Sequence, residues 1–418
     1  MSEPQDTKPL PTIFQLTPLD PTYRADPHQV LDDLRARCPV HRDNVSGTFV
    51  LTRYNDIRPL VSDRSLWRDP LNAEEAAVMQ RRFADVVPEG AARGETTSIL
   101  MLDDPDHARI RGPLVQAFYA RVARSRPQVE EIVDRSLDAI AAITEQGQPF
   151  DLMSRFCVPI PIDAIASILG VEHSRLAEFR EWSEGVIQSL NPFRNEDQTA
   201  QMERCSEALS AYFAATIEER RRNPQDDLIS DMTRLQGEGA PLSDVELQIN
   251  LSALLIGGNL TTTDLIGNAV RLLLLHPEEL AKLKADPGLI NQVVEETLRY
   301  EPPVDITGRI ASRDMEVGGC PVKTSQAFTF SLRAANRDPD VFEDPHRFDV
   351  NRKGKPHVAF GGGAHICIGA PLARLEAQVA LGKLFERFPN LRFAEPEAAP
   401  EWRTLPFFRG LERLELRA

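Results

Sequence analysis

The stretch Phe360–Leu375, FGGGAHICIGAPLARL, decides how the rest of the chain is interpreted. Three consecutive glycines, Gly361–Gly363, are followed by a single cysteine, Cys367, and then by Pro371. Proline is favoured in the first turn of a helix, so we expect a helix to begin just after the cysteine. A loop without side chains lets its backbone approach a flat and bulky group.

The expected helix gives Cys367 an electropositive setting, because unpaired N–H groups and the helix dipole favour an anion at a helix N-terminus. We therefore expect a lowered pKa and a thiolate, the form that ligates metals. Three competing interpretations are weaker. A buried structural cysteine needs no glycines. A zinc site would use Cys367 with His365 alone, and the phosphate-loop patterns GxxxxGK[ST] and GxGxxG are absent.

The pattern Phe360-Gly-x-Gly363-x-His365-x-Cys367-x-Gly369 resembles the haem-binding loop of the cytochrome P-450 family, soluble bacterial type. The resemblance implies a mainly α fold with a small β-rich region. It implies haem b, iron protoporphyrin IX, as cofactor, with the Cys367 thiolate as axial metal ligand. It also implies that the loop residues against the cofactor are Phe360, Gly361, His365, Cys367 and Gly369.

Composition and charge are consistent with that class of protein. The 418 residues carry a net charge of −15, which argues against a nucleic-acid partner. No run of 18 apolar residues predicts a membrane span, and the N-terminus does not read as a signal peptide. Five scattered cysteines suit a reducing cytoplasm. We expect a flexible tail over residues 1–12, a single domain over 13–418, and a monomer in the cytoplasm.

A long helix is the second strong prediction. Ser243 and Glu246 form a capping box, and the apolar pattern continues to Leu275 before Pro277 stops it. Two glycines inside that helix cost roughly 1 kcal/mol each against alanine. Thr261 follows Gly257 by four residues, so its hydroxyl can reach that carbonyl and leave a groove with a hydroxyl at its edge. Helix packing would explain the glycines but not the threonine.

This segment is similar to the oxygen-activation motif of the family, which implies catalytic roles for Gly258 and Thr261. Leu260 departs from the motif, since the family usually has a carboxylate there. Asp264, three residues beyond Thr261, is our candidate substitute for the missing acid. A solvated Asp264 is the simpler alternative.

Two further motifs match the family in chain order. His107 and Arg111 lie four residues apart on one helix face, and the resemblance implies that they bind the haem propionates together with Arg309. Glu296 and Arg299 match a structural Glu-x-x-Arg pair. We expect its third partner from Pro345–Phe348, with Arg347 first and Arg352 as the second choice.

The resemblance implies a haem-thiolate monooxygenase that inserts one oxygen atom of O2 into an apolar or partly apolar small organic substrate, by hydroxylation or O-dealkylation. The chain has no flavin or iron–sulfur segment, so electrons are expected from a separate ferredoxin and ferredoxin reductase. A basic face that includes Arg352–Lys355 is the hypothetical docking surface. The expected pocket residues are Leu254, Gly257, Val304, Ile306 and Phe407.

The main alternative is a haem-dependent peroxygenase, isomerase or dehydratase, which Leu260 favours. A non-catalytic haem sensor is a further option. Arg81, Arg82 and Arg93, in the long connection of residues 67–98, either bind a substrate carboxylate or face water.

Overall fold

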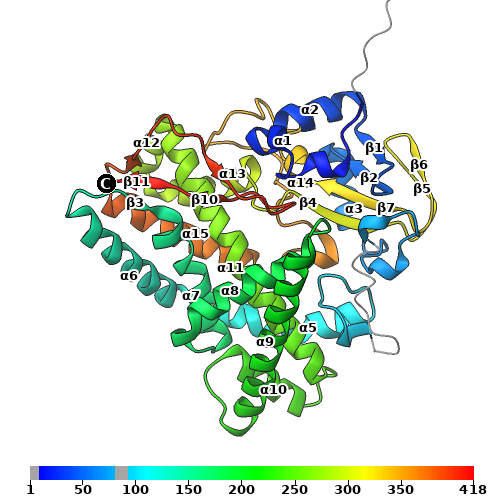
Figure 1. Ribbon diagram of the computed structural model, residues 1–418, viewed down its shortest axis with the longest axis horizontal. Helices are drawn as coiled ribbons and strands as arrows, with labels where there is room; N and C mark the ends of the chain where they lie inside the picture. Colours follow the sequence, from blue (N-terminus) through cyan, green and yellow to red (C-terminus); the bar gives the residue numbers. More distant parts are fainter. Residues whose placement is uncertain (1–8, 81–92) are drawn as a thin grey trace, which may run out of the picture.

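The computed structural model describes residues 9–80 and 93–418. Helices dominate these residues, and a small β-rich part lies on one side, next to α1–α3 (Figure 1). The helices are α1 (Pro21–Ala25), α2 (Pro27–Arg37), α3 (Tyr54–Ser62), α5 (Asp106–Val122), α6 (Arg126–Thr144), α7 (Pro159–Leu169), α8 (Leu176–Val186), α9 (Glu196–Arg222), α10 (Leu228–Gly237), α11 (Asp244–Leu275), α12 (Pro277–Ala285), α13 (Ile290–Tyr300), α14 (Leu332–Ala335) and α15 (Ala370–Arg387).

The β-rich part is built around a four-stranded sheet of order β1-β2-β7-β4, in which only β2 and β7 run parallel. The other strands form a three-stranded sheet and two hairpins. The strands are β1 (Val40–Asp43), β2 (Thr48–Leu51), β3 (Phe150–Asp151), β4 (Ile306–Ile310), β5 (Met315–Val317), β6 (Cys320–Val322), β7 (Ala327–Ser331), β8 (Arg392–Phe393), β9 (Glu401–Trp402), β10 (Leu411–Arg413) and β11 (Glu415–Arg417).

The long helix α11 has the predicted limits. Ser243 Oγ accepts a hydrogen bond from the Glu246 N–H, and Glu246 Oε2 accepts one from the Ser243 N–H at 2.9 Å. Pro277 begins the next helix. Helix α11 runs through the middle of the helical part (Figure 1) and packs against α7, α8, α9, α13 and α15. It is buried along most of its length, as expected of a helix with few charges.

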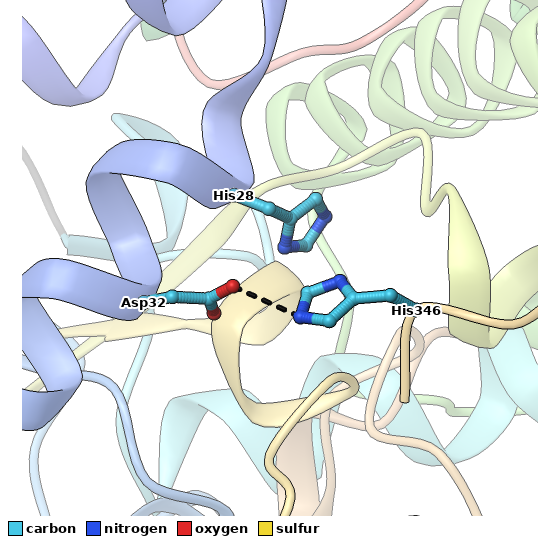
Figure 2. Close-up of side chains that lie close together, drawn as sticks. All are labelled: His28, Asp32 and His346. Carbon is cyan, nitrogen blue, oxygen red and sulfur yellow. Dashed lines mark ion pairs between the residues drawn. The ribbon is translucent and has the colours of Figure 1, made fainter. Parts of the chain in front are cut away.

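We define the Cys loop as residues 360–369. Helix α2 contacts the irregular chain that precedes this loop and so joins it to the β-rich part. His346, in this irregular chain, places its Nε2 atom 2.9 Å from Asp32 Oδ2 on α2 (Figure 2). Tyr300, the last residue of α13, donates its hydroxyl proton to the His346 carbonyl at 3.0 Å. These contacts bring the N-terminal helices, α13 and the irregular chain together.

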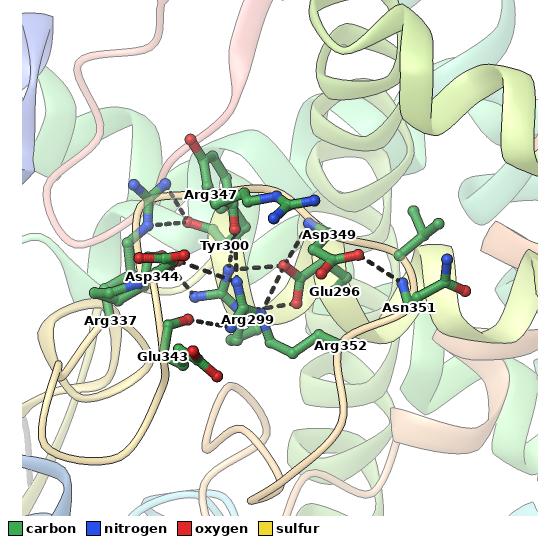
Figure 3. A network of polar contacts seen from close by, with 12 residues as sticks. Glu296, Arg299, Tyr300, Arg337, Glu343, Asp344, Arg347, Asp349, Asn351 and Arg352 are labelled. Atoms are coloured by element: carbon green, nitrogen blue, oxygen red, sulfur yellow. Dashed lines mark hydrogen bonds and ion pairs between the residues drawn. The ribbon is translucent and has the colours of Figure 1, made fainter.

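A buried ion pair anchors that irregular chain. Arg299 Nε and Nη2 donate to the two carboxylate oxygens of Glu296, each at 2.7 Å, and both side chains are buried (Figure 3). The remaining Arg299 donors bond the carbonyls of Asn336, Pro345 and Arg347 at 2.9–3.0 Å. The planar fork of arginine suits this role, because it bonds a carboxylate and backbone oxygens at the same time.

The third member of the Glu296–Arg299 network is Arg352, not Arg347. Arg352 Nε donates to Glu296 Oε1 at 3.1 Å, and Arg352 Nη2 donates to the Arg347 carbonyl at 2.8 Å. Arg347 contributes its main-chain oxygen, so the expectation for its side chain is wrong. The Asp349 N–H also donates to Glu296 Oε1, at 2.9 Å. The turn at residues 343–349 exposes carbonyls toward α13, which is why the arginine after the turn completes the network.

Replacing Arg352 tests this assignment. We expect Arg352→Ala to lower the stability of the haem-loaded protein by about 2–3 kcal/mol, since a buried carboxylate loses a charge-assisted hydrogen bond. Arg347→Ala is the matched control and should stay within about 0.5 kcal/mol. Urea midpoints of both variants measure the difference, and an equal or reversed order would contradict the assignment.

Candidate functional site

A large cavity of about 2020 Å³, including its open mouth, lies between α11, the Cys loop, β4 and the turn before β10. Most of its lining is aliphatic or aromatic. The structure brings all of the expected pocket residues to this one cavity: Leu254, Gly257, Val304, Ile306 and Phe407.

Cys367 lines the cavity and is exposed toward it. Its N–H donates to the Phe360 carbonyl at 3.0 Å, which closes the loop on itself. The Ala370 N–H, at the start of α15, donates to the Cys367 carbonyl at 3.4 Å, and the N–H groups of Gly369 and Ala370 lie near the sulfur. Although Cys367 is open to the cavity, the surrounding protein shields its thiol from bulk water and so raises the pKa of the thiol, and the N–H groups of Gly369 and Ala370 with Arg111 only partly oppose that effect. The expected lowering is therefore wrong for the free thiol, although a bound metal ion deprotonates a coordinating thiol outright.

Two of the consecutive glycines of the Cys loop, Gly361 and Gly363, serve different surfaces. Gly361 and Gly363 have φ values of 69° and 65°, in the left-handed region that favours glycine. Gly361 lines the cavity. A Cβ atom on Gly363 would lie only 3.0 Å from the backbone of Ser62 in α3. One glycine thus opens the cavity wall, and another lets the loop pack closely on α3.

Cationic and imidazole groups gather where the Cys loop meets α5 and β4. The rings of His107 and His365 lie 4.2 Å apart between centroids. Arg111 donates to the Ile366 carbonyl at 2.5 Å, and the buried Arg309 donates to the Val61 carbonyl at 2.9 Å. The predicted set of His107, Arg111, Arg309 and His365 is therefore assembled in one place.

Two acidic residues, Asp103 and Asp104, lie near this group, with Asp104 Oδ1 3.6 Å from His107 Nδ1, but they leave part of it without a partner. His107 Nε2 and His365 Nδ1 are buried and have no hydrogen-bond partner. Burial, together with the neighbouring Arg68 guanidinium, lowers the pKa of Arg309 to about 9, although Asp103 opposes the shift. Burial also lowers the pKa of His365 to about 2, so this ring is neutral. Unpaired donors and mutually repelling guanidinium groups are the expected surroundings of a dianion such as the two propionates of haem. The residues present therefore fit that cofactor.

Sequence reasoning missed Arg68. Its Nη1 donates to Thr307 Oγ1 at 2.6 Å and its Nε to the Leu100 carbonyl at 2.8 Å, and the residue lines the cavity. Burial lowers the pKa of Arg68 to about 10, opposed by Asp103. Arg68 belongs to an irregular connection with neither period nor motif, so nothing in its local sequence marks it.

Of the other three arginines predicted in that connection, only Arg93 lies in the described residues, and it is not among those that line the cavity. Arg93 pairs with Asp69 through two hydrogen bonds of 2.5 and 2.6 Å. Arg81 and Arg82 lie outside the described residues.

Thr261 takes the position expected from its spacing. Its Oγ1 donates to the Gly257 carbonyl at 2.8 Å, and both residues line the cavity. Thr262 lines the cavity as well. Helix α11 remains helical through this segment, so the groove comes from the missing side chain of Gly257 and not from a break in the helix.

Two residues of α11, Gly258 and Leu260, are turned away from the cavity. Gly258 faces α7, where an added Cβ would meet Ile165 at 3.3 Å, so this glycine serves helix packing. Leu260 is buried in the apolar core. Neither residue is among those that line the cavity.

Asp264 is likewise placed away from the cavity lining and is not solvated. It is buried and paired with Arg403, in the space left by Gly410. Burial raises the pKa of Asp264 to about 6, although the Arg403 guanidinium opposes the rise. The Arg403 contact draws the carboxylate toward the β9–β10 hairpin. The prediction that Asp264 replaces the missing distal acid does not fit this placement.

Within the described residues, no helix combines the length and the apolar character that crossing a bilayer requires.

Comparisons with known proteins agree with this geometry. The model of the family described as Cytochrome P450 matches residues 288–402. Cytochrome P450 107B1 of Saccharopolyspora erythraea is 38% identical over 97% of this chain and 98% of its own length. The 6-deoxyerythronolide B hydroxylase of the same organism is 34% identical over 95% of this chain and 97% of its own.

Solved structures give the same result. The crystal structure of P450BioI in complex with an acyl carrier protein ligated to hexadec-9Z-enoic acid is 32% identical, with a TM-score of 0.84 over 95% of this chain and 100% of that chain. Members of this family are haem-thiolate oxidoreductases with a cysteine as axial ligand of the iron. Cys367 lines the cavity just before a helix, and the chain aligns with these relatives over nearly its whole length. We conclude that this chain belongs to the cytochrome P450 family of monooxygenases.

Proposed function

We propose that the protein binds haem b with the Cys367 thiolate on the iron and inserts one oxygen atom of O2 into an apolar or partly apolar small organic substrate, by hydroxylation or O-dealkylation. The observation that carries the proposal is the position of Cys367. It lies in the same apolar cavity as Thr261, beside a cluster of arginines and histidines in which His107 Nε2 and His365 Nδ1 have no hydrogen-bond partner. When bound, the haem supplies the activation of O2.

The residues of the chain divide the remaining work. His107, Arg68, Arg111, Arg309 and His365 hold the two propionates and fix the orientation of the macrocycle. Phe360 lines the cavity beside the sulfur, with the Arg374 guanidinium 4.5 Å from its ring centre. The N–H groups of Gly369 and Ala370 stabilise negative charge on the sulfur and tune the potential of the metal that it binds.

Thr261 supplies a hydrogen-bond acceptor inside the apolar cavity. Its hydroxyl proton is committed to the Gly257 carbonyl, so its free lone pairs face the groove. A water molecule placed there would point a proton away from Thr261 and toward the centre of the cavity. In this way the threonine orients a proton donor without being the source of the proton.

Electrons are proposed to come from a separate ferredoxin and its reductase. The basic docking surface is smaller than the sequence suggests, because Arg352 bonds Glu296 and Arg109 bonds Glu246. Lys353 and Lys355 remain exposed on the approach to the Cys loop, which supports docking of an acidic partner there. We propose that the protein acts as a monomer.

A second candidate function is suggested by the part of the cavity that faces Cys367 from α11. Leu260 is in the core, and the described cavity lining contains no carboxylate, so no acid of the chain is placed to deliver protons. This observation favours a peroxygenase, or a haem-dependent isomerase or dehydratase, which needs no protons relayed to bound O2.

Turnover assays distinguish the two functions. With a reduced ferredoxin and O2 we expect product, and the rate should fall with rising salt as charge pairing is screened. Cys367→Ser should abolish this product and the thiolate band of the reduced carbon monoxide complex. Cys320→Ser, on β6, is the control and should change neither. Product with hydrogen peroxide and none with ferredoxin would contradict monooxygenation in favour of the alternative.

Arg68 gives a test of cofactor retention. We expect Arg68→Ala to release haem about 10–100-fold faster, since it loses a charge-assisted hydrogen bond worth about 1.5–3 kcal/mol. Arg313→Ala, an exposed arginine that pairs with Asp63 at 2.9 Å, is the control. Transfer of haem to an acceptor globin measures both rates, and release at the wild-type rate from Arg68→Ala would show that this residue does not hold the cofactor.

The charge of the lining also restricts the substrate. Arg68, Arg111 and Arg309 are the charged residues of the described lining, and it contains no Asp, Glu or Lys. An ammonium group buried there would lack a counterion, which costs several kcal/mol. We therefore propose a neutral or anionic substrate, with an apolar body.

Matched compounds test this restriction. We expect neutral apolar compounds to shift the spin state of the haem on binding, and their primary-amine analogues to bind at least ~100-fold more weakly, because the ammonium is unpaired. Optical titration of each pair measures both dissociation constants. Equal affinity within a pair would contradict the restriction.

A further inference from the structure

Outside the cavity, three metal-binding side chains converge where α2 meets the irregular chain before the Cys loop. They are His28 and Asp32 on α2, and His346 (Figure 2). Each offers one ligand atom, and these atoms lie within 4.8 Å of one another. The two imidazole rings lie 5.4 Å apart between centroids.

His28 is the anomaly of this cluster. Its residue exposure is 6%, and neither ring nitrogen has a hydrogen-bond partner. Its ring is directed into the space beside Asp32 and His346 (Figure 2). Burial and the nearby Arg337 lower the pKa of His28 well below its usual range, so the ring is neutral and keeps a free lone pair. A buried imidazole without a partner carries an uncompensated desolvation cost that a bound group would remove.

We propose that His28, Asp32 and His346 form a binding site for one divalent transition-metal ion of the zinc type. Two imidazole nitrogens and one carboxylate oxygen are a set that suits Zn²⁺, whereas Mg²⁺ and Ca²⁺ prefer oxygen ligands throughout. The side chain of His346 is 49% exposed, so water reaches the ion and completes its coordination. The ligand atoms lie within 4.8 Å of one another, so a tetrahedral ion would require the exposed His346 ring to turn slightly toward it.

Neighbouring arginines shape the site without closing it. Arg35 donates to Asp32 Oδ1 at 2.7 Å, which leaves Oδ2 directed at His346. Arg337 Nη1 lies 3.3 Å from His346 Nδ1, and the same guanidinium bonds the Tyr300 carbonyl at 2.7 and 3.0 Å. When the metal takes Nε2, the His346 proton moves to Nδ1, and Arg337 retains its two bonds to Tyr300. The nearby positive charge makes the site weaker than a closed structural zinc site.

The ion would connect two segments far apart in sequence. His28 and Asp32 belong to the N-terminal helix α2, while His346 follows Pro345, whose carbonyl accepts a hydrogen bond from Arg299. Binding to the folded chain alone stabilises it through linkage. We therefore expect the metal to fasten α2 to the chain that supports the Cys loop.

The proposal is tested by metal binding to the haem-loaded, full-length protein after a chelator has removed any divalent ion that is not part of the haem. Calorimetry should find one Zn²⁺ per chain, and excess Mg²⁺ or Ca²⁺ should not compete. His346→Ala and Asp32→Asn should each weaken binding more than about tenfold. Co²⁺ bound in place of Zn²⁺ should show ligand-field bands without a thiolate charge-transfer band, which separates this site from the free cysteines.

His173→Ala is the matched control. His173 also forms a histidine–aspartate contact, 2.9 Å from Asp163, but no third ligand completes a cluster there among the described residues. This variant should bind Zn²⁺ as the wild type does. His28→Leu removes the buried ligand, and His346→Ala, at an exposed position, keeps the test valid if His28→Leu fails to fold. No one-to-one binding, or binding unchanged in both His346→Ala and Asp32→Asn, would overturn the proposal.

Discussion

The buried contact between Arg299 and Glu296 is the interaction on which the site depends. It holds one end of α13 against the carbonyls of the chain before the Cys loop, and Arg352 completes it from the other side. A buried carboxylate and guanidinium cannot be separated without leaving an unpaired charge in the core. The direction of the Cys loop, and with it the sulfur of Cys367, follows from this fixed support.

Much of this arrangement could be read from the sequence, because its strongest signals are local. The capping box at Ser243 and the stop at Pro277 set the ends of α11, and the four-residue spacing from Gly257 to Thr261 places a hydroxyl in the cavity. Such features depend on helix geometry alone. The mainly α fold and the cavity position of Cys367 are expected for another reason, namely the resemblance of residues 360–369 and the other motifs to one family.

The features that could not be read depend on contacts between distant segments. Arg68 reaches the cavity because β4 presents Thr307 to it, and no local pattern encodes that contact. Asp264 follows Thr261 by three residues, a spacing compatible with catalysis, yet its carboxylate is paired with Arg403 in the β9–β10 hairpin. The thiol of Cys367 has a raised pKa, since burial outweighs the helix N-terminus until a metal ion is present. In each case tertiary context decides between options that helix geometry leaves open.

The separation between the sulfur and the propionate-binding groups has a consequence for how the protein matures. In the proposed site, recognition of the two carboxylates would use α5, β4 and Arg68, whereas ligation would use Cys367, just before the start of α15. The proposed carboxylate contacts do not require iron. An iron-free porphyrin would therefore be held by the same side chains, and the protein that carries it would be fluorescent and inactive.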